Sequence, residues 1–161
     1  MAMACLKPIF KWSHTTIDLI VWCGKRLFND TRYMLKLKTV ELNQLPRRLF
    51  IGNTVMELTI MSPIITKFEN LEDNMTEFLK KYNLGYILWN NEKCLALIKV
   101  CNDYFLFNPN YRCRTNRNDD SSICVLKFKK LIKLIEYLFA DVTVDKSTKL
   151  SIGPVMMSKS K

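Results

Sequence analysis

The residues best suited to binding chemistry lie in one polar stretch of the sequence, residues 109–121. Tyr111, Arg112, Arg114 and Arg117 follow one another closely there. Guanidinium groups beside an aromatic ring can contact phosphates and stack on a nucleobase. An ordinary charged loop has the same composition, so the sequence leaves both interpretations open.

Catalysis by a nucleophile and a base would have to use His14, because the sequence contains a single histidine. The structural alternative is that His14 is a surface or capping residue just before a helix. Cys5 and His14 could together supply the nucleophile and the base of a thiol hydrolase, which is the third of three function hypotheses for this chain. The adjacent carboxylates Asp119 and Asp120 follow three arginines and are interpreted as part of a loop ion cluster, not as an acid and base pair.

The sequence predicts no cofactor and no metal. Its six cysteines contain no CxxC pair, and zinc would require paired spacing together with more histidine. The four glycines stand far apart, so there is no phosphate-binding glycine loop. Without a secretion signal, the cysteines are expected to be reduced and mostly structural.

The net charge is positive and unevenly distributed. Twenty-five Lys and Arg residues against fifteen Asp and Glu residues give a formal net charge of +10. The excess lies in residues 1–48 and 129–161, whereas residues 49–84 carry more acidic than basic side chains. A basic balance favours acidic partners such as nucleic acid, an anionic membrane surface or an acidic protein, and it also serves solubility alone.

The elements that must position these residues begin with helices in the first half. Apolar spacings of three and four predict a helix from Thr15 or Thr16 to about Phe28. Its inward face would consist of Ile17, Ile20, Val21, Gly24, Leu27 and Phe28, with close packing at the glycine. Residues 55–61 predict a strand, and a second helix is expected from Leu71 to about Tyr82, acidic at its start and basic at its end.

The second half predicts an antiparallel meander followed by a helix over Lys129–Ala140. Short connections suit hairpins between the first three of its strands, and Pro109–Ser121 is predicted to be a polar loop. The four strands are expected at Tyr86–Trp89, Cys94–Cys101, Tyr104–Asn108 and Ser122–Phe128. The predicted fold class is therefore α+β, an antiparallel β-meander packed with flanking helices.

The chain of 161 residues is expected to form a single domain over residues 1–142. Residues 143–161, poor in large apolar side chains, are expected to be a mobile basic tail. No apolar run reaches the ~18 residues of a membrane span, and the first residues lack a signal-peptide core. These features predict an intracellular protein, nuclear or cytoplasmic, without a membrane partner.

Several short motifs, in this order, resemble a group of papain-like cysteine peptidases. The group includes the deubiquitinating domain of herpesvirus large tegument proteins and similar domains in insects and insect viruses. The motifs are Lys11-Trp12, Ile17-Asp18 and Gly24, the pair Gly85–Leu88 and Cys94–Ile98, then Tyr104–Asn110, Ser122–Phe128 and a closing helix. The resemblance spans residues 11–140 and implies a papain-like scaffold.

This sequence departs from the group at the catalytic positions. In those peptidases a Phe-Asp-Pro-His motif supplies the Asp and His of the triad, and the matching positions here are Asn108 and Asn110. An amide has no titratable group near neutral pH and cannot accept a thiol proton. The nucleophile of the group lies on a helix upstream of its Trp segment, and only eleven residues precede Trp12. The resemblance implies a degenerate, inactive relative.

Two function hypotheses follow. The first is a non-catalytic pseudo-peptidase that binds a protein partner, ubiquitin-like or other, with residues 109–121 as a variable contact surface. The second is a basic protein associated with nucleic acid or chromatin. Its phosphate contacts would come from both basic ends of the chain and from Arg112, Arg114 and Arg117.

Overall fold

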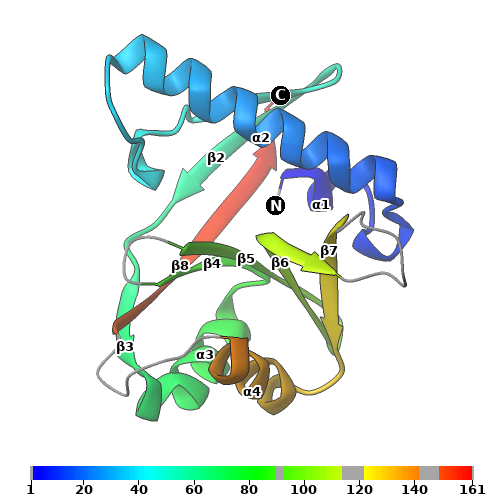
Figure 1. The fold of residues 1–161 in the computed structure, drawn as a ribbon, viewed down its shortest axis with the longest axis vertical. Helices are drawn as coiled ribbons and strands as arrows, with labels where there is room; N and C mark the ends of the chain where they lie inside the picture. The colour runs from blue at the N-terminus through cyan, green and yellow to red at the C-terminus, as the bar shows by residue number, and fades with distance from the viewer. Residues whose placement is uncertain (1, 90–92, 114–121, 142–148, 161) are drawn as a thin grey trace. The chain divides into compact units, whose positions relative to one another are not determined.

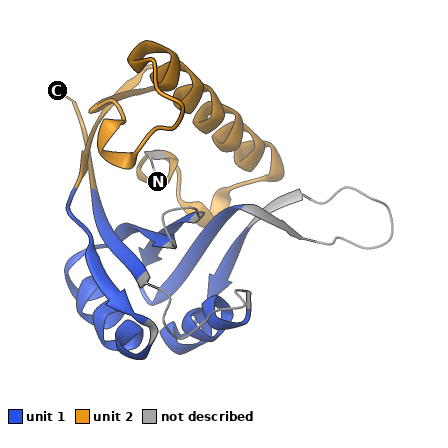
Figure 2. Ribbon diagram, turned by 60° about the vertical axis from the view of Figure 1, so that its left-hand side comes forward, with its two compact units in different colours: residues 1, 61–111, 125–155 blue, residues 2–60, 112–124, 156–161 orange. Residues whose placement is uncertain are grey.

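The computed structural model describes residues 2–89, 93–113, 122–141 and 149–160 (Figure 1). They fall into two compact units that are interleaved along the sequence (Figure 2). The first unit contains residues 61–111 and 125–155, and the second contains residues 2–60, 112–124 and 156–161. That residues 1–142 act as a single domain stays a prediction.

The first unit is built on an antiparallel sheet. In this unit the strand order is β8-β4-β5-β6-β7, and β3 pairs with the other edge of β8. The predicted α+β meander is thereby confirmed, with two further strands beside it. The strands are β3 (Ile64–Lys67), β4 (Leu84–Trp89), β5 (Lys93–Val100), β6 (Asp103–Cys113), β7 (Ser122–Phe128) and β8 (Lys149–Lys159), and β6, β7 and β8 each have one end in the second unit.

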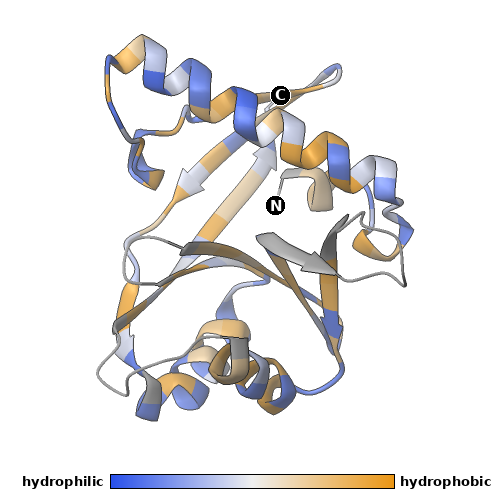
Figure 3. Cartoon of the chain, in the orientation of Figure 1, coloured by the Kyte–Doolittle hydropathy of each residue, from blue (hydrophilic) through white to orange (hydrophobic). Residues whose placement is uncertain are grey.

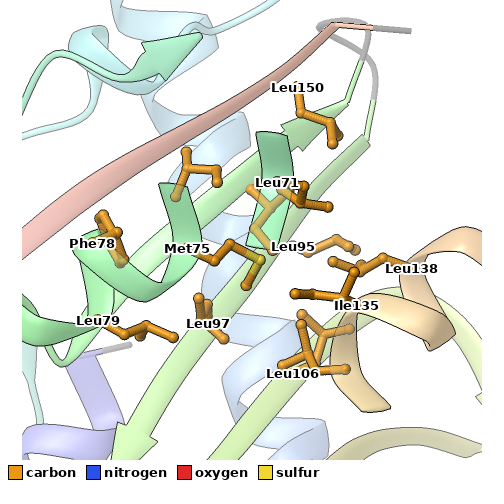
Figure 4. Packing of buried hydrophobic residues seen from close by; sticks show 13 residues of the cluster. Leu71, Met75, Phe78, Leu79, Leu95, Leu97, Leu106, Ile135, Leu138 and Leu150 are labelled. Carbon is orange, nitrogen blue, oxygen red and sulfur yellow. The ribbon is translucent and has the colours of Figure 1, made fainter. Parts of the chain in front are cut away.

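Two helices supply the core of the first unit, α3 (Leu71–Lys81) and α4 (Leu131–Asp141). Their apolar side chains form one cluster with the strands, drawn in Figure 4. In α3, Leu71, Met75, Phe78 and Leu79 are buried. In α4, Leu134, Ile135 and Leu138 are buried, whereas Ile132 and Phe139 are exposed. The cluster consists of Leu71, Met75, Phe78, Leu79, Ile87, Leu95, Leu97, Leu106, Leu134, Ile135, Leu138, Leu150 and Ile152.

Two glycines permit a close approach within this sheet. Tyr86 of β4 is paired with Gly153 of β8, and a Cβ at position 153 would overlap the Tyr86 ring. A Cβ at Gly85 would meet the ring of Phe78 and would lie 2.9 Å from the carbonyl oxygen of Gly153. Glycine is therefore required at both positions by packing against neighbouring rings and backbone.

The expectation of a mobile tail after residue 142 is wrong for residues 149–159, which form β8. This strand lies between β3 and β4, with Ile152 paired to Ile64 on one side and to Ile87 on the other. Leu150, Ile152 and Val155 are buried. Burial of these few apolar residues outweighs the low strand propensity of their small and polar neighbours. Residues 142–148 lie outside the described residues.

The second unit contains a long helix and a hairpin. The hairpin joins β1 (Arg48–Ile51) to β2 (Thr54–Ile60) through a two-residue turn, where Gly52 has a positive φ of 57°. The backbone amide of Ser160 donates to the carbonyl of Val55 at 2.9 Å, which fixes the chain after β8. Shorter helical segments are α1 (Ala2–Leu6), η1 (Ile9–Lys11) and η2 (Leu42–Gln44).

The long helix, α2 (His14–Leu35), differs from its prediction. Ser13, not a threonine, is the N-cap, and the helix continues past Phe28 to Leu35, with Lys36 as its C-cap in the left-handed conformation. The polar segment after Phe28 suggested an end, but the helix continues through it, since weak propensity costs only tenths of a kcal/mol, up to ~0.7 per residue. Close packing at Gly24 is wrong, because the space around its Cα is open.

Candidate functional site

The position matched to the catalytic Asp of the peptidase group lies in β6. Asn108 is 7% exposed and is one of three buried polar side chains among the described residues. By strand alternation it shares a face with Leu106, which belongs to the core cluster. A buried amide can donate and accept hydrogen bonds, but it has no titratable group near neutral pH.

The predicted loop beyond Asn108 is partly wrong. β6 continues through Pro109 to Cys113, so the backbone of Asn110, Tyr111 and Arg112 is extended strand. Proline suggested a loop because it cannot donate to a sheet ladder. The side chains of these three residues, and Arg114 and Arg117 altogether, lie outside the described residues. The structure therefore does not test the grouping of these four binding candidates.

Cys5 and His14 lie on different helices of the second unit. Cys5 is an exposed residue of the five-residue helix α1, and His14 is the exposed first residue of α2. The protein around the Cys5 sulfur desolvates it enough to raise the pKa of the thiol. A raised pKa lowers the thiolate fraction, which is the reverse of what a nucleophilic cysteine needs.

The start of α2 is held by a small polar network. The Ser13 hydroxyl accepts from the Thr16 amide at 3.2 Å and lies 3.0 Å from the Thr16 hydroxyl. Lys7 donates to that same hydroxyl at 3.3 Å, and the Trp12 indole donates to the Lys7 carbonyl at 3.0 Å. The Trp12 segment singled out by the resemblance therefore fixes the chain at the helix N-terminus.

The cysteines of the described residues differ in burial and therefore in reactivity. In β5, burial raises the pKa of Cys94 to about 11, so this thiol is unreactive near neutral pH. Cys23 and Cys101 are exposed, and both are free thiols. Within the described part of the chain, no cluster of three or more His, Cys, Asp or Glu residues could hold a metal ion.

A compact ion cluster joins the start of β6 to the end of β7. The Asp103 carboxylate contacts the amines of Lys127 at 2.7 Å and Lys129 at 2.8 Å. Hydrogen bonds from both lysines lower the pKa of Asp103 and hold it ionised, and the pKa of Lys129 is raised in turn. The Lys127 amine also lies 5.6 Å from the centre of the Phe105 ring. This cluster stabilises the strand ends.

The most prominent exposed surface of the second unit is one side of α2, called here the α2 outer face. It contains Leu19, Trp22, Arg26, Asp30 and Tyr33, at spacings of three, four and seven residues that place them on one stripe. Trp22 is 57% exposed and Tyr33 is 86% exposed. The opposite side carries the two buried residues of this helix, Ile17 and Thr31. In Figure 3, α2 accordingly alternates between hydrophobic and hydrophilic residues.

Contacts within the α2 outer face order its side chains. The Arg26 guanidinium lies 5.6 Å from the centre of the Trp22 ring and 3.7 Å from the Asp30 carboxylate. This surface was not predicted, because the apolar spacings indicated a helix that ends near Phe28 and marked only its inward face. The signal was present as the second stripe of spacings from Leu19 to Tyr33.

Comparison with solved structures defines the class of fold. The chain matches the ubiquitin-specific protease encoded by murine cytomegalovirus tegument protein M48, whose crystal structure contains a ubiquitin-based suicide substrate. The TM-score is 0.71 at 12% identity, over 91% of this chain and 68% of that chain. This chain therefore shares the fold of that viral ubiquitin-specific protease, and the papain-like scaffold that the sequence resemblance implied is confirmed.

The family is defined by the sequence itself. The model for the herpesvirus tegument protein N-terminal conserved region matches residues 1–161, and the chain belongs to this family. A search of curated proteins found no match. Among the described residues, no helix is long and apolar enough to cross a membrane.

Proposed function

We propose that this chain is a non-catalytic, peptidase-like domain that acts by binding another protein. The proposal rests on two amides, Asn108 and Asn110, at the positions that the sequence resemblance matches to the Asp and His of the triad, in a fold similar to that of a ubiquitin-specific protease. Without the carboxylate and the imidazole, no group at these positions can remove a proton from a thiol. A scaffold without these groups can still bind a partner protein.

The state of the candidate nucleophile supports this proposal. Cys5 lies on a helix of five residues, too short to supply the anion-stabilising N-terminus that lowers thiol pKa in reactive cysteines. Desolvation raises its pKa instead. Both features disfavour the third hypothesis, a thiol hydrolase that uses Cys5 with His14.

Ubiquitin is the first partner to test, because the matched protease was solved with a ubiquitin-based substrate. An electrophilic ubiquitin probe reports catalysis, and titration with unmodified ubiquitin by isothermal calorimetry reports binding. We expect no covalent adduct with the wild-type chain, while an active deubiquitinase in parallel is labelled fully. An adduct that disappears in Cys5→Ala but persists in the control Cys23→Ala would contradict the proposal.

The contact surface predicted at residues 109–121 is tested separately. Protein partners captured by the full chain are compared with those captured by a chain in which residues 114–119 are replaced by a Gly-Ser linker. Loss of partners supports a role for this segment. Unchanged partners would exclude residues 114–119 as the contact surface and leave the non-catalytic function standing.

A second candidate function is binding to nucleic acid, and the formal net charge of +10 favours it. Phosphate contacts release counterions, so affinity would fall steeply as salt increases. Fluorescence anisotropy of a labelled single-stranded and a labelled double-stranded oligonucleotide, measured from low to physiological salt, tests this. Affinity that does not change with salt would exclude this second function.

A further inference from the structure

The α2 outer face exposes large apolar and aromatic side chains that contribute nothing to solubility. Only two of the 22 residues in α2 are buried, whereas Leu19, Trp22 and Tyr33 stand exposed on the far side. Trp, Tyr and Arg are the residue types that concentrate binding energy at protein interfaces. All three types occur here on one stripe.

Three side chains of this stripe already contact one another in the free protein. Arg26 stacks over Trp22 and pairs with Asp30, so these three restrain one another. Association then orders fewer side chains, which lowers the entropic cost of binding. A preorganised aromatic and arginine pair is therefore suited to recognition.

The charge around the α2 outer face identifies the chemistry of its occupant. Residues 14–36, which comprise α2 and its C-cap, contain four basic and two acidic side chains, and the basic residues Arg32 and Lys36 lie at its C-terminal end. At the C-terminal end of α2 an open hollow combines basic and apolar groups. A ligand with carboxylates beside apolar side chains complements both properties. The hollow is lined by Arg32, Tyr33, Met34, Lys36 and Leu37.

Two other occupants fit less well. The outer face of a second copy of this chain would offer no free carboxylate to Arg32 and Lys36, because its own Asp30 is paired with Arg26. A membrane-surface helix presents a broad continuous apolar face to the lipid. Here the centre of the stripe is occupied by the ion pair between Arg26 and Asp30.

We propose that the α2 outer face binds an acidic amphipathic helix of a partner protein. The apolar stripe, with anchors three to fourteen positions apart, suits a helix laid along another helix. The apolar side of the partner would cover Leu19, Trp22 and Tyr33, and its carboxylates would meet Arg32 and Lys36. This inference rests on the proposed protein-binding function and names its surface and the class of its partner.

The test is site-directed photo-cross-linking of the full chain in cells that contain its natural partners. A benzophenone amino acid replaces Trp22 or Tyr33, and Phe50 of β1, which is 79% exposed, serves as the control position. Mass spectrometry then maps the cross-linked peptide. We expect cross-links at 22 and 33, but not at 50, to a segment with net negative charge and apolar residues spaced by three and four.

Affinity for a synthetic peptide of the cross-linked segment provides the second measurement. We expect at least a tenfold loss for Trp22→Ala, Tyr33→Ala and the double variant Arg32→Glu/Lys36→Glu, and less than a twofold change for Phe50→Ala. Cross-links to a second copy of the chain, to lipid or nucleic acid, to a basic segment, or to nothing would overturn the inference. Partners captured equally by wild type and Trp22→Ala would overturn it too, yet would leave the proposed function intact.

Discussion

Helices α3 and α2 use apolar residues in opposite ways. The eleven residues of α3 include four that are buried in the core, while the 22 residues of α2 include only two buried ones. The aromatic residue of α3, Phe78, is enclosed by the sheet, whereas Trp22 of α2 faces solvent. Apolar residues in α3 therefore serve folding, and those on the outer face of α2 remain available for a partner.

The largest expected effect is the difference in stability lost when one aromatic side chain of α3 and one of α2 are truncated to alanine. Phe78→Ala removes a fully packed ring, and such truncations cost about 3–5 kcal/mol of stability. Trp22→Ala removes an exposed ring and should change stability by about 0.5 kcal/mol. Urea unfolding of both variants gives the comparison. Equal destabilisation by the two substitutions would mean that Trp22 also belongs to a packed core.

A pair of glycine substitutions sharpens the same contrast. A Cβ at Gly153 overlaps the Tyr86 ring, so Gly153→Ala should cost about 1–3 kcal/mol through overpacking. Gly24 in α2 has open space around it, and Gly24→Ala should stabilise the chain by about 0.5–1 kcal/mol through helix propensity. Thermal unfolding of each variant shows whether the substitution stabilises or destabilises the chain. Stabilisation by Gly153→Ala would contradict the close approach of β4 and β8.

Thiol labelling compares the units at single residues. Cys94 in β5 has a pKa raised to about 11 by burial, whereas Cys23 on α2 is exposed. Because the thiolate is the reactive form, we expect N-ethylmaleimide at pH 7 to modify Cys94 at least tenfold more slowly than Cys23. Timed quenching with peptide mass spectrometry gives both rates. Comparable rates would show that β5 opens readily in the folded protein.

The smallest expected effect concerns the ion cluster at Asp103. Its pKa is lowered by hydrogen bonds from Lys127 and Lys129, so its stabilising contribution is fully present above the ordinary aspartate pKa of about 3.9 and is lost as pH falls through the lower folded value. Asp103→Asn should reduce stability near pH 6 and flatten this acid-side decline. Melting temperatures between pH 2 and 6 provide the measurement. Parallel curves for variant and wild type would argue against the cluster.

Most of the first unit could be predicted from sequence because its signals are local. In α3 the apolar period, the acidic start at Glu72 and Asp73 and the basic end at Lys80 and Lys81 all indicate the same element. The meander strands alternate and are separated by short polar turns. Agreement among independent local signals is what made these elements readable.

The missed elements depend on contacts that no local window contains. Gly153-Pro154 in β8 argues against a strand, since proline is uncommon inside a sheet. Yet Gly153 leaves room for the Tyr86 ring, because it has no Cβ. The Pro154 carbonyl accepts from the Met61 amide at 3.1 Å. The strand at Pro109 was missed for the same reason. Of the candidate site, the amides at positions 108 and 110 could be identified from the sequence alone, whereas the exposure of Trp22 and Tyr33 on α2 became evident only from the three-dimensional structure.

The place of β8 has a consequence for biosynthesis. β3 ends at Lys67, but its partner residues in β8 begin only at Lys149. On the ribosome, β3 and one edge of β4 are therefore made long before the strand that covers them, and their unpaired backbone groups are open to other chains in the meantime. We expect nascent chains released before residue 149 to aggregate, and the sheet to close only after translation has passed the last strand.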